Sequence, residues 1–203
     1  MEQHLGARYE IQKILGEGGF GIVLLVKDLH EDSFVAVKVL RKQKLCRKSA
    51  TVACLKNERG FLEELRGVPY VSQMIFAKDS PENLYIGMEF CQGGDLKQLI
   101  KNYGPFPDSA TRFYAAEIVL GLTEIHRRGI VHLDLKPSNF LVTNSGHLQL
   151  ADFGLSLRLL PGQRMEGTVG TPIYRPPEMF STSFSFEADI WAFSCIIVEI
   201  YSR

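Results

Sequence analysis

The sequence lacks an excess of charge of either sign. Its 23 lysine and arginine residues are balanced by 23 aspartate and glutamate residues, so the formal net charge at pH 7 is +0. Proteins that bind nucleic acids or membrane surfaces usually carry a basic excess, because their partners are polyanions. The charge balance therefore argues against nucleic acid and against membrane as partners.

Long hydrophobic runs are also absent. The N-terminal residues contain no apolar stretch that could act as a secretory signal, and the longest strongly apolar run, residues 190–198, is shorter than the roughly 20 residues that cross a bilayer. The four cysteines have no CxxC spacing, which fits reduced thiols better than a disulfide framework. These features predict a cytoplasmic protein.

What remains is an ordinary globular composition, with 45% apolar and 23% charged residues in a chain of 203. Apolar and β-branched runs predict strands in the first part of the chain. A 3.6-residue period predicts one long helix at residues 49–66, which Gly67 and Pro69 end. The five predicted strands are residues 9–15, 22–26, 34–40, 70–77 and 84–90.

The composition changes after Gly93 and Gly94, and the second part is mainly helical. A short helix is predicted at residues 95–102, starting at Asp95, and a long one up to about residue 128 with Asp108 as its N-cap. Short strands are predicted near residues 140–143 and 147–150, an irregular stretch at 155–175, and a last helix from about residue 185.

Both long helices of this part are apolar around much of their circumference. In the first of them the apolar positions include Phe113, Ala116, Leu120 and Ile125. A helix that is apolar on most sides belongs inside a core. The sequence therefore predicts that both helices are well buried.

Gly16, Gly18 and Gly21 follow a GxGxxG pattern between two predicted strands. Glycine allows a backbone to approach phosphate oxygens without a Cβ in the way. A dinucleotide-binding site needs a helix directly after the glycines, whereas residues 22–26 are typical of a strand. A flap over phosphates is therefore favoured over a nicotinamide site, and a plain hairpin turn is the alternative without function.

Lys38 ends the apolar run Val35-Ala36-Val37. Its side chain either extends to solvent or holds a positive charge for phosphate oxygens. The second interpretation needs an acid to orient the ammonium group, and Glu58 in the following helix is the candidate.

Residues 132–139 read His-Leu-Asp-Leu-Lys-Pro-Ser-Asn and contain three groups suited to phosphoryl transfer. Asp134 can accept a proton, Lys136 can carry positive charge, and Asn139 can offer an amide oxygen to a metal. Asp152 begins an Asp-Phe-Gly sequence and supplies a second metal-binding acid. Phosphoryl transfer depends mainly on positioning and charge neutralisation, so these residue types match its needs.

The ordered combination is far more specific than any of its parts. In order, the chain carries the glycine pattern, Val-Ala-Val-Lys, Glu58, His-x-Asp-x-Lys-x-x-Asn, Asp-Phe-Gly and Pro-Pro-Glu at residues 176–178. This set resembles the eukaryotic protein kinase family over residues 9–203. The residues around Lys136 and the sequence Gly170-Thr171-Pro172 resemble those of the serine/threonine branch.

The resemblance implies an α+β, bilobal fold. Residues 9–90 would form an N-lobe with a five-stranded antiparallel sheet and the helix that carries Glu58, residues 91–94 the hinge, and residues 95–203 a mainly helical C-lobe. In the family the large lobe continues for several more helices. The resemblance therefore implies a partial domain that needs a C-terminal segment or a regulatory partner.

The resemblance also implies that ATP and Mg²⁺ are the cofactors. The glycine turn would cover the phosphates, Val23, Ala36 and Leu141 would enclose the adenine, Met88 would be the gatekeeper, and residues 89–91 the hinge. The implied nucleotide-binding residues are Gly16, Glu17, Gly18, Gly19, Phe20, Gly21, Val23, Ala36, Lys38, Met88, Glu89, Phe90, Cys91, Asp95 and Leu141.

The implied catalytic residues are Asp134, Lys136, Lys38, Glu58 and Thr171, and the implied metal ligands are Asn139 and Asp152. Asp134 would orient the substrate hydroxyl, Lys136 would neutralise the transferred phosphoryl group, and Thr171 would bond to both. Asp189 would anchor the loop from beneath. The implied activity is transfer of the γ-phosphoryl group of Mg-ATP to a serine or threonine of a protein substrate.

Two alternatives to an active kinase exist. One is a pseudokinase that serves as a binding or scaffold module, and the other is a catalytically incompetent fragment of an active kinase. Pseudokinases usually lose the lysine, the base or a metal ligand, whereas Lys38, Asp134, Asn139 and Asp152 are all present. The residues favour the active enzyme.

Leu133 departs from the family pattern, because many kinases carry an arginine there that receives the phosphate of the activation segment. The usual phosphothreonine position, three residues before Gly170, is Gly167. Both departures predict a kinase that does not depend on phosphorylation through that clamp.

Overall fold

The computed structural model describes residues 5–18, 21–42 and 58–202. The chain divides into two compact units, Met1–Arg66 with Ser72–Phe90 and Gly67–Val71 with Cys91–Arg203. Within the described ranges, no helix is long and apolar enough to cross a membrane.

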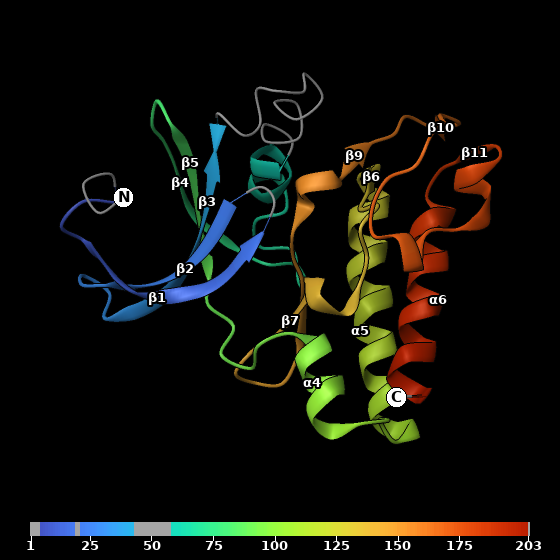
Figure 1. The fold of residues 1–203 in the computed structure, drawn as a ribbon, viewed down its shortest axis with the longest axis horizontal. Helices are drawn as coiled ribbons and strands as arrows, with labels where there is room; N and C mark the ends of the chain where they lie inside the picture. Colours follow the sequence, from blue (N-terminus) through green and yellow to red (C-terminus); the bar gives the residue numbers. More distant parts are fainter. Residues whose placement is uncertain (1–4, 19–20, 43–57, 203) are drawn as a thin grey trace. The chain divides into compact units, whose positions relative to one another are not determined.

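The first unit is built on one antiparallel sheet of five strands in the order β1-β2-β3-β5-β4 (Figure 1). This confirms the predicted α+β class and its N-terminal sheet. The strands are β1 (Tyr9–Gly18), β2 (Gly21–Asp28), β3 (Ser33–Arg41), β4 (Met74–Asp79) and β5 (Asn83–Glu89).

One predicted strand was placed too early. Residues 70–73 lie outside β4, because Tyr70 has a positive φ of 62° and the bridge between Val71 and Leu150 is an isolated one. A left-handed backbone interrupts a strand. Of the helix predicted at 49–66, residues 58–64 are helical, and residues 49–57 lie outside the described residues.

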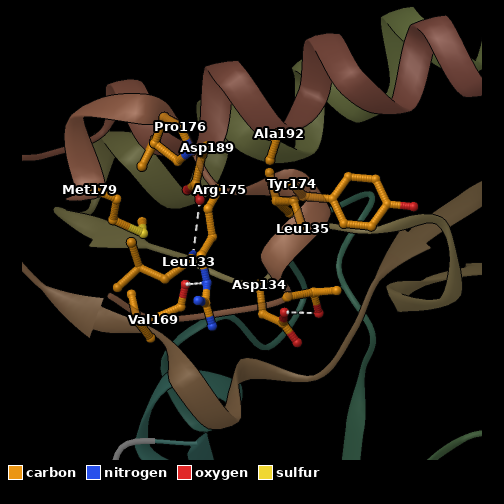
Figure 2. A pocket seen from close by; sticks show the side chains of 12 residues that line it. Leu133, Asp134, Leu135, Val169, Tyr174, Arg175, Pro176, Met179, Asp189 and Ala192 are labelled. Atoms are coloured by element: carbon orange, nitrogen blue, oxygen red, sulfur yellow. Dashed lines mark hydrogen bonds between the residues drawn. The ribbon is translucent and has the colours of Figure 1, made fainter. Parts of the chain in front are cut away.

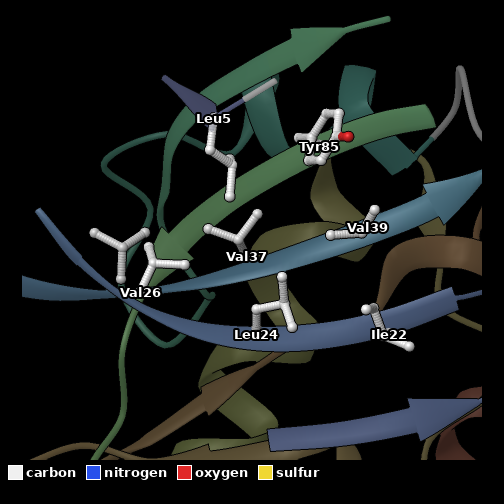
Figure 3. Close-up of a cluster of buried hydrophobic side chains, with 8 residues drawn as sticks. Leu5, Ile22, Leu24, Val26, Val37, Val39 and Tyr85 are labelled. Carbon is white, nitrogen blue, oxygen red and sulfur yellow. The ribbon is translucent and has the colours of Figure 1, made fainter. Parts of the chain in front are cut away.

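The core of the first unit lies on one face of β2 and β3 (Figure 3). Side chains alternate between the two faces of a strand, so every second residue joins this cluster. Each buried aliphatic side chain contributes about 1.5–3 kcal/mol of transfer free energy. The cluster consists of Leu5, Ile22, Leu24, Val26, Val35, Val37, Val39 and Tyr85.

The second unit contains three helices and several very short strands. The helices are α4 (Leu96–Tyr103), α5 (Asp108–Arg127) and α6 (Glu187–Ser202). The strands are β6 (Ile130–Val131), β7 (Phe140–Val142), β8 (Leu148–Leu150), β9 (Leu157–Arg158), β10 (Met165–Glu166) and β11 (Ser183–Phe184). The single-turn 3₁₀ helices are η1 (Pro137–Asn139), η2 (Phe153–Leu155), η3 (Pro172–Tyr174) and η4 (Pro177–Phe180).

The predicted helix caps were half right. Asp95 caps α4, because its side chain accepts a hydrogen bond from the Gln98 amide at 2.9 Å. Asp108 is not the cap of α5: Pro107 occupies that position, and Asp108 is the first helical residue. An acid in the first turn still interacts favourably with the helix dipole.

The predicted burial of α5 was wrong on most sides. Phe113, Ala116 and Leu120 are exposed in the described chain, whereas Ile125 is buried. The helix buries only one stripe, which consists of Thr111, Glu117, Ile118, Gly121, Leu122 and Ile125. The sequence pattern hid this stripe because one of its members is a glutamate.

A similar correction applies to α6, which packs beside α5 (Figure 1). Its buried stripe follows the helical period, but Ile190, Val198 and Tyr201 are at least half exposed, at 50%, 64% and 60%. The buried residues are Ala188, Asp189, Ala192, Ile196 and Ile200.

The predicted irregular stretch at residues 155–175 contains only two-residue strands and 3₁₀ turns. β9 pairs with β6, and β10 pairs with β11. The stretch is therefore attached at two places to the rest of the second unit.

Asp28, at the end of β2, anchors the turn into β3. Its carboxylate accepts hydrogen bonds from the Arg8 guanidinium at 2.7 and 2.9 Å and from the His30 and Glu31 amides. The Arg8 hydrogen bonds lower the pKa of Asp28 to about 2. The ionised form is therefore stabilised by folding.

This lowered pKa predicts a specific pH dependence of stability. Because the folded-state pKa lies below the ordinary value of 3.8, the contribution is present above that value and is lost as pH falls through about 2. Asp28→Asn should lower the melting temperature by several degrees at about pH 7, and the difference from the parent should shrink between about pH 4 and 2. Melting curves across this range test the prediction, with the surface substitution Asp79→Asn as control. A difference that stays constant down to the lowest pH would contradict it.

Candidate active site

The face of the sheet opposite the core carries four of the predicted nucleotide-binding residues. Ala36 and Lys38 alternate with core residues of β3, so they project from the other face. Val23 pairs with Lys38, and Met88 pairs with Ala36. Directly paired residues share a face, so the structure brings these four side chains together.

Lys38 is not extended into solvent. Its Nζ lies 2.6 Å from Glu58 Oε1, and the two side chains are only 14% and 3% exposed. A buried pair of this kind holds its charges because each compensates the desolvation of the other. The predicted pairing is therefore confirmed, and the ammonium group has a fixed position on the sheet.

The glycine turn joins two strands, as predicted. Gly18 pairs with Gly21, and Gly16 pairs with Val23, so no helix follows the glycines. A Cβ at Gly16 or Gly18 would have no atom within 4 Å, whereas one at Gly21 would lie 1.9 Å from the Val39 carbonyl oxygen. Gly21 is thus required by packing, while the other two leave open space above the backbone. Glu17 lies between them in β1, and the predicted residues Gly19 and Phe20 lie outside the described residues.

The predicted hinge residues of the first unit lie at the end of β5. The Glu89 amide donates to the Gln73 carbonyl at 3.0 Å. The Phe90 ring packs edge-on against Phe34 with centroids 6.5 Å apart. These contacts fix the backbone where the first unit ends.

The second unit contains three more of the predicted nucleotide-binding residues. Cys91 is buried, and its Sγ lies 3.5 Å from Gln149 Oε1. Asp95 forms an isolated β-bridge with Leu141, so these two lie side by side. Because the Asp95 carboxylate also caps α4, an acid at this position has a structural reason that does not depend on nucleotide binding.

Asp134, Lys136 and Thr171 form one hydrogen-bonded cluster. Asp134 Oδ1 accepts from Thr171 Oγ1 at 2.7 Å, and Asp134 Oδ2 accepts from Lys136 Nζ at 2.6 Å. Lys136 Nζ also donates to Thr171 Oγ1 at 3.2 Å. The predicted bonds of Thr171 to both residues are confirmed. Asp134 is only 8% exposed, so these bonds hold its carboxylate in one orientation.

Asp189 of α6 anchors the loop of residues 132–139, as predicted. Its carboxylate accepts from the backbone amides of His132 at 2.8 Å and Leu133 at 2.9 Å. The His126 ring of α5 contacts the same carboxylate at 2.8 Å. The His132 ring is buried edge-on against Phe153, and its Nε2 lies 3.1 Å from the Ala151 carbonyl oxygen. The loop is thus fixed on both sides.

Gly170 brings Thr171 to the loop. With φ at +79°, its backbone is left-handed, and a Cβ there would lie 2.1 Å from the Leu133 carbonyl oxygen. Only glycine tolerates both the conformation and the approach. Arg175 holds the same turn, because its guanidinium donates to the carbonyl of Val169 (Figure 2) and also to that of Gly170.

The two predicted metal ligands are oriented differently. Asn139 is buried, and its Nδ2 donates to the Asp134 carbonyl at 2.9 Å. Since the amide nitrogen is bonded, the amide oxygen is the group that remains to meet a cation. Asp152 is exposed and has a left-handed backbone with φ at +64°, a conformation that is uncommon outside glycine and often occurs at functional sites.

Two oxygen donors suit magnesium, which keeps some ligands from outside the protein, better than a metal whose ligands all come from the protein. In the described ranges no group of three or more histidine, cysteine, aspartate or glutamate side chains could hold a metal ion. Magnesium is commonly bound through one or two carboxylates together with phosphate oxygens and water. The side-chain oxygens of Asn139 and Asp152 are of the type that such an arrangement uses.

Two interactions between distant residues escaped the sequence interpretation. Glu117 of α5 contacts the His147 ring and accepts from the Leu148 amide at 2.8 Å, which ties α5 to β8. Tyr174 donates to Glu199 at 2.6 Å, which ties η3 to α6. A glutamate in the stripe that also carries Gly121 and Ile125 was a signal for the first, whereas no local pattern indicates the second.

Comparison with known proteins agrees with this geometry. The chain is 35% identical over 196 residues to 3-phosphoinositide-dependent protein kinase 1 of Homo sapiens, covering 95% of this chain and 35% of that protein. It is 37% identical over 199 residues to Rho-associated protein kinase 1 of Homo sapiens, covering 95% of this chain and 14% of that protein. Identity to the probable serine/threonine protein kinase IREH1 of Arabidopsis thaliana is 35% over 225 residues, covering 95% of this chain and 17% of that protein.

The chain thus spans at most 35% of the length of these relatives. The family model described as protein kinase domain matches residues 9–203. This match takes in both units of the fold and every residue of the candidate site. The chain belongs to the protein kinase family.

Proposed function

We propose that the chain is the catalytic part of an ATP-dependent protein serine/threonine kinase, with its two units as the N-lobe and C-lobe and residues 91–94 as the hinge. The reaction transfers the γ-phosphoryl group of Mg-ATP to a serine or threonine hydroxyl of a protein substrate. The observation that carries the proposal is the cluster of Asp134, Lys136 and Thr171, in which a base, a cation and a hydroxyl are held together by three hydrogen bonds.

Each member of the cluster has a role that follows from its contacts. A new bond forms between the substrate oxygen and the γ-phosphorus, the bond to the β–γ bridging oxygen breaks, and ADP leaves. Asp134 accepts the proton of the attacking hydroxyl, because each carboxylate oxygen can accept more than the one bond it has in the structure. Lys136 offers positive charge to the transferred group, and Thr171 keeps both side chains in place.

The parts of the nucleotide are assigned to residues by the chemistry of their side chains and backbone. Lys38, oriented by Glu58, carries the charge for the α- and β-phosphates, and the open backbone at Gly16 and Gly18 leaves room above them. Asn139 and Asp152 are the ligands for magnesium. When magnesium is bound with ATP, it neutralises charge on the phosphate oxygens.

Removal of the base tests the central assignment. Asp134→Asn keeps the shape of the side chain but removes the proton acceptor, so transfer of γ-phosphate to a generic basic protein should fall by ~10²–10⁴-fold in kcat. Asp108→Asn, an exposed change in the same unit, is the matched control and should leave the rate unchanged. If Asp134→Asn transferred phosphate at the parent rate, the assignment would be wrong. A parent that binds nucleotide without transferring phosphate would indicate the scaffold alternative.

The hydroxyl of residue 171 can be tested separately. Thr171→Val removes the hydrogen bonds to Asp134 and Lys136 with little change of shape, while Thr171→Ser keeps the hydroxyl. A hydrogen bond to a charged group contributes about 1.5–3 kcal/mol, so the valine variant should lose roughly tenfold to a hundredfold in kcat. The serine variant should recover most of that loss. Equal kcat values for the two variants would exclude a role of the hydroxyl.

The metal ligands can be tested by binding instead of activity. ATP should raise the melting temperature of the parent more when magnesium is present than when it is absent. Asp152→Asn should lose the magnesium-dependent part of this shift and retain the magnesium-independent part, because only the charged ligand is changed. Asp108→Asn again serves as the control. A magnesium-dependent shift that is as large in Asp152→Asn as in the parent would rule out Asp152 as a ligand.

A further inference from the structure

Residues 152–178 form a segment that begins at the proposed metal ligand Asp152. Apolar packing around Leu133 holds this segment against residues 132–139, which are called the catalytic loop. Figure 2 shows the Leu133 side chain between Val169 and Met179. Leu133 is 6% exposed, although it directly precedes the base Asp134. The same core contains Val131, Leu159, Phe184 and Ala188, with Leu157, Met165, Val169 and Phe186 packed against it.

This core joins three parts of the second unit. Val131 and Leu133 belong to β6 and the catalytic loop, and Leu157, Leu159, Met165 and Val169 belong to the segment. The third part is α6 with the stretch that leads into it, which contributes Met179, Phe184, Phe186 and Ala188. Apolar side chains from all three pack together in this one core. Exposing any one part would return the apolar surface of the other two to water.

Leu133 is also fixed through its backbone. Its amide donates to Asp189, its carbonyl oxygen lies against Gly170, and its φ is +67°. A positive φ in a non-glycine residue persists only where the surroundings determine it. The side chain therefore enters the core from a backbone that is held in place independently.

Two arginines of the segment bind acceptors that lie within the chain. Arg175 donates to the carbonyl oxygens of Val169 and Gly170. Arg164 donates to Ser183 Oγ at 2.8 Å and to the Ser183 carbonyl at 2.7 Å, and it also contacts the Glu187 carboxylate. Both guanidinium groups hold the segment through acceptors that the chain itself provides.

We propose that Leu133 is a positioning residue: its packed core seats residues 157–169 so that Thr171 reaches Asp134 and Lys136 without a phosphate on the segment. Three consecutive residues connect Leu133 to the cluster. Leu133 packs on Val169, Gly170 lies against the Leu133 carbonyl, and Thr171 comes next. An apolar side chain at residue 133 thus replaces an ionic clamp by burial. The effect on catalysis rests on the proposed function, whereas the seating of the segment does not.

Limited proteolysis of the whole chain tests the seating. Trypsin can cleave after Arg164, whose side chain is 49% exposed, if the backbone around it opens. The variants to compare are Leu133→Ala, the volume-conserving Leu133→Met, and Leu148→Ala, which removes an equally buried leucine from β8 outside the core. The parent is measured before and after phosphatase treatment.

Leu133→Ala should raise the rate of cleavage after Arg164 by about tenfold or more over Leu148→Ala, because proteolysis follows the population of the open form. Leu133→Met should resemble the parent, and phosphatase treatment should not change the parent rate. Equal rates for Leu133→Ala and Leu148→Ala would overturn the proposal. A phosphatase-treated parent that is cleaved as fast as Leu133→Ala would overturn it as well.

Kinetics give a second, separable measurement. If the proposed kinase activity holds, Leu133→Ala should lower kcat with little change in the KM for ATP, since Thr171 and Asp134 act on the transferred group, while Leu133→Met should restore kcat. A rise in KM with unchanged kcat would contradict a positioning role. If neither the parent nor any variant transfers phosphate, the proposed function fails, while the proteolysis result stands.

Discussion

The carboxylate of Asp189 binds three groups that lie 56 to 63 residues before it in the sequence: the His126 ring and the backbone amides of His132 and Leu133. A buried carboxylate costs several kcal/mol in lost hydration unless donors replace the water. With 1% exposure, Asp189 requires these donors, and they require it. Helices α5 and α6 and the loop of residues 132–139 therefore have one relative arrangement in the second unit.

Two kinds of force act on the two sides of the loop. Toward Asp134, the contacts are charge-assisted hydrogen bonds, which are short and directional. Around Leu133, the contacts are apolar and depend on close packing. Neither kind is sufficient by itself: a hydrogen bond between mobile groups has little directional value, and an apolar core does not orient a carboxylate. The site obtains orientation from the first and order from the second.

The sequence predicted the five strands of the first unit, because apolar and β-branched runs of strand length mark segments such as β2 and β3. It also predicted the contacts of Lys38, Asp134 and Thr171, since the ordered motifs of a large family carry that information. What it missed depends on partners far along the chain. Glu117 in α5 looks like a surface residue until the His147 ring and the Leu148 amide satisfy it. The helical period similarly could not show which apolar side of α6 is buried.

The close contact of Gly170 with the Leu133 carbonyl oxygen differs in kind from the charged bonds around it. Dissolved ions screen mainly exposed charges that lie further apart than the Debye length of about 8 Å at physiological ionic strength, so they weaken a contact pair such as Lys136 and Asp134 only slightly. They do not alter the steric repulsion between two backbones. The position of residue 171 relative to the loop is therefore set by a contact that ionic strength leaves unchanged. Salt acts on the strength of the hydrogen bonds of Thr171 but not on which groups they join.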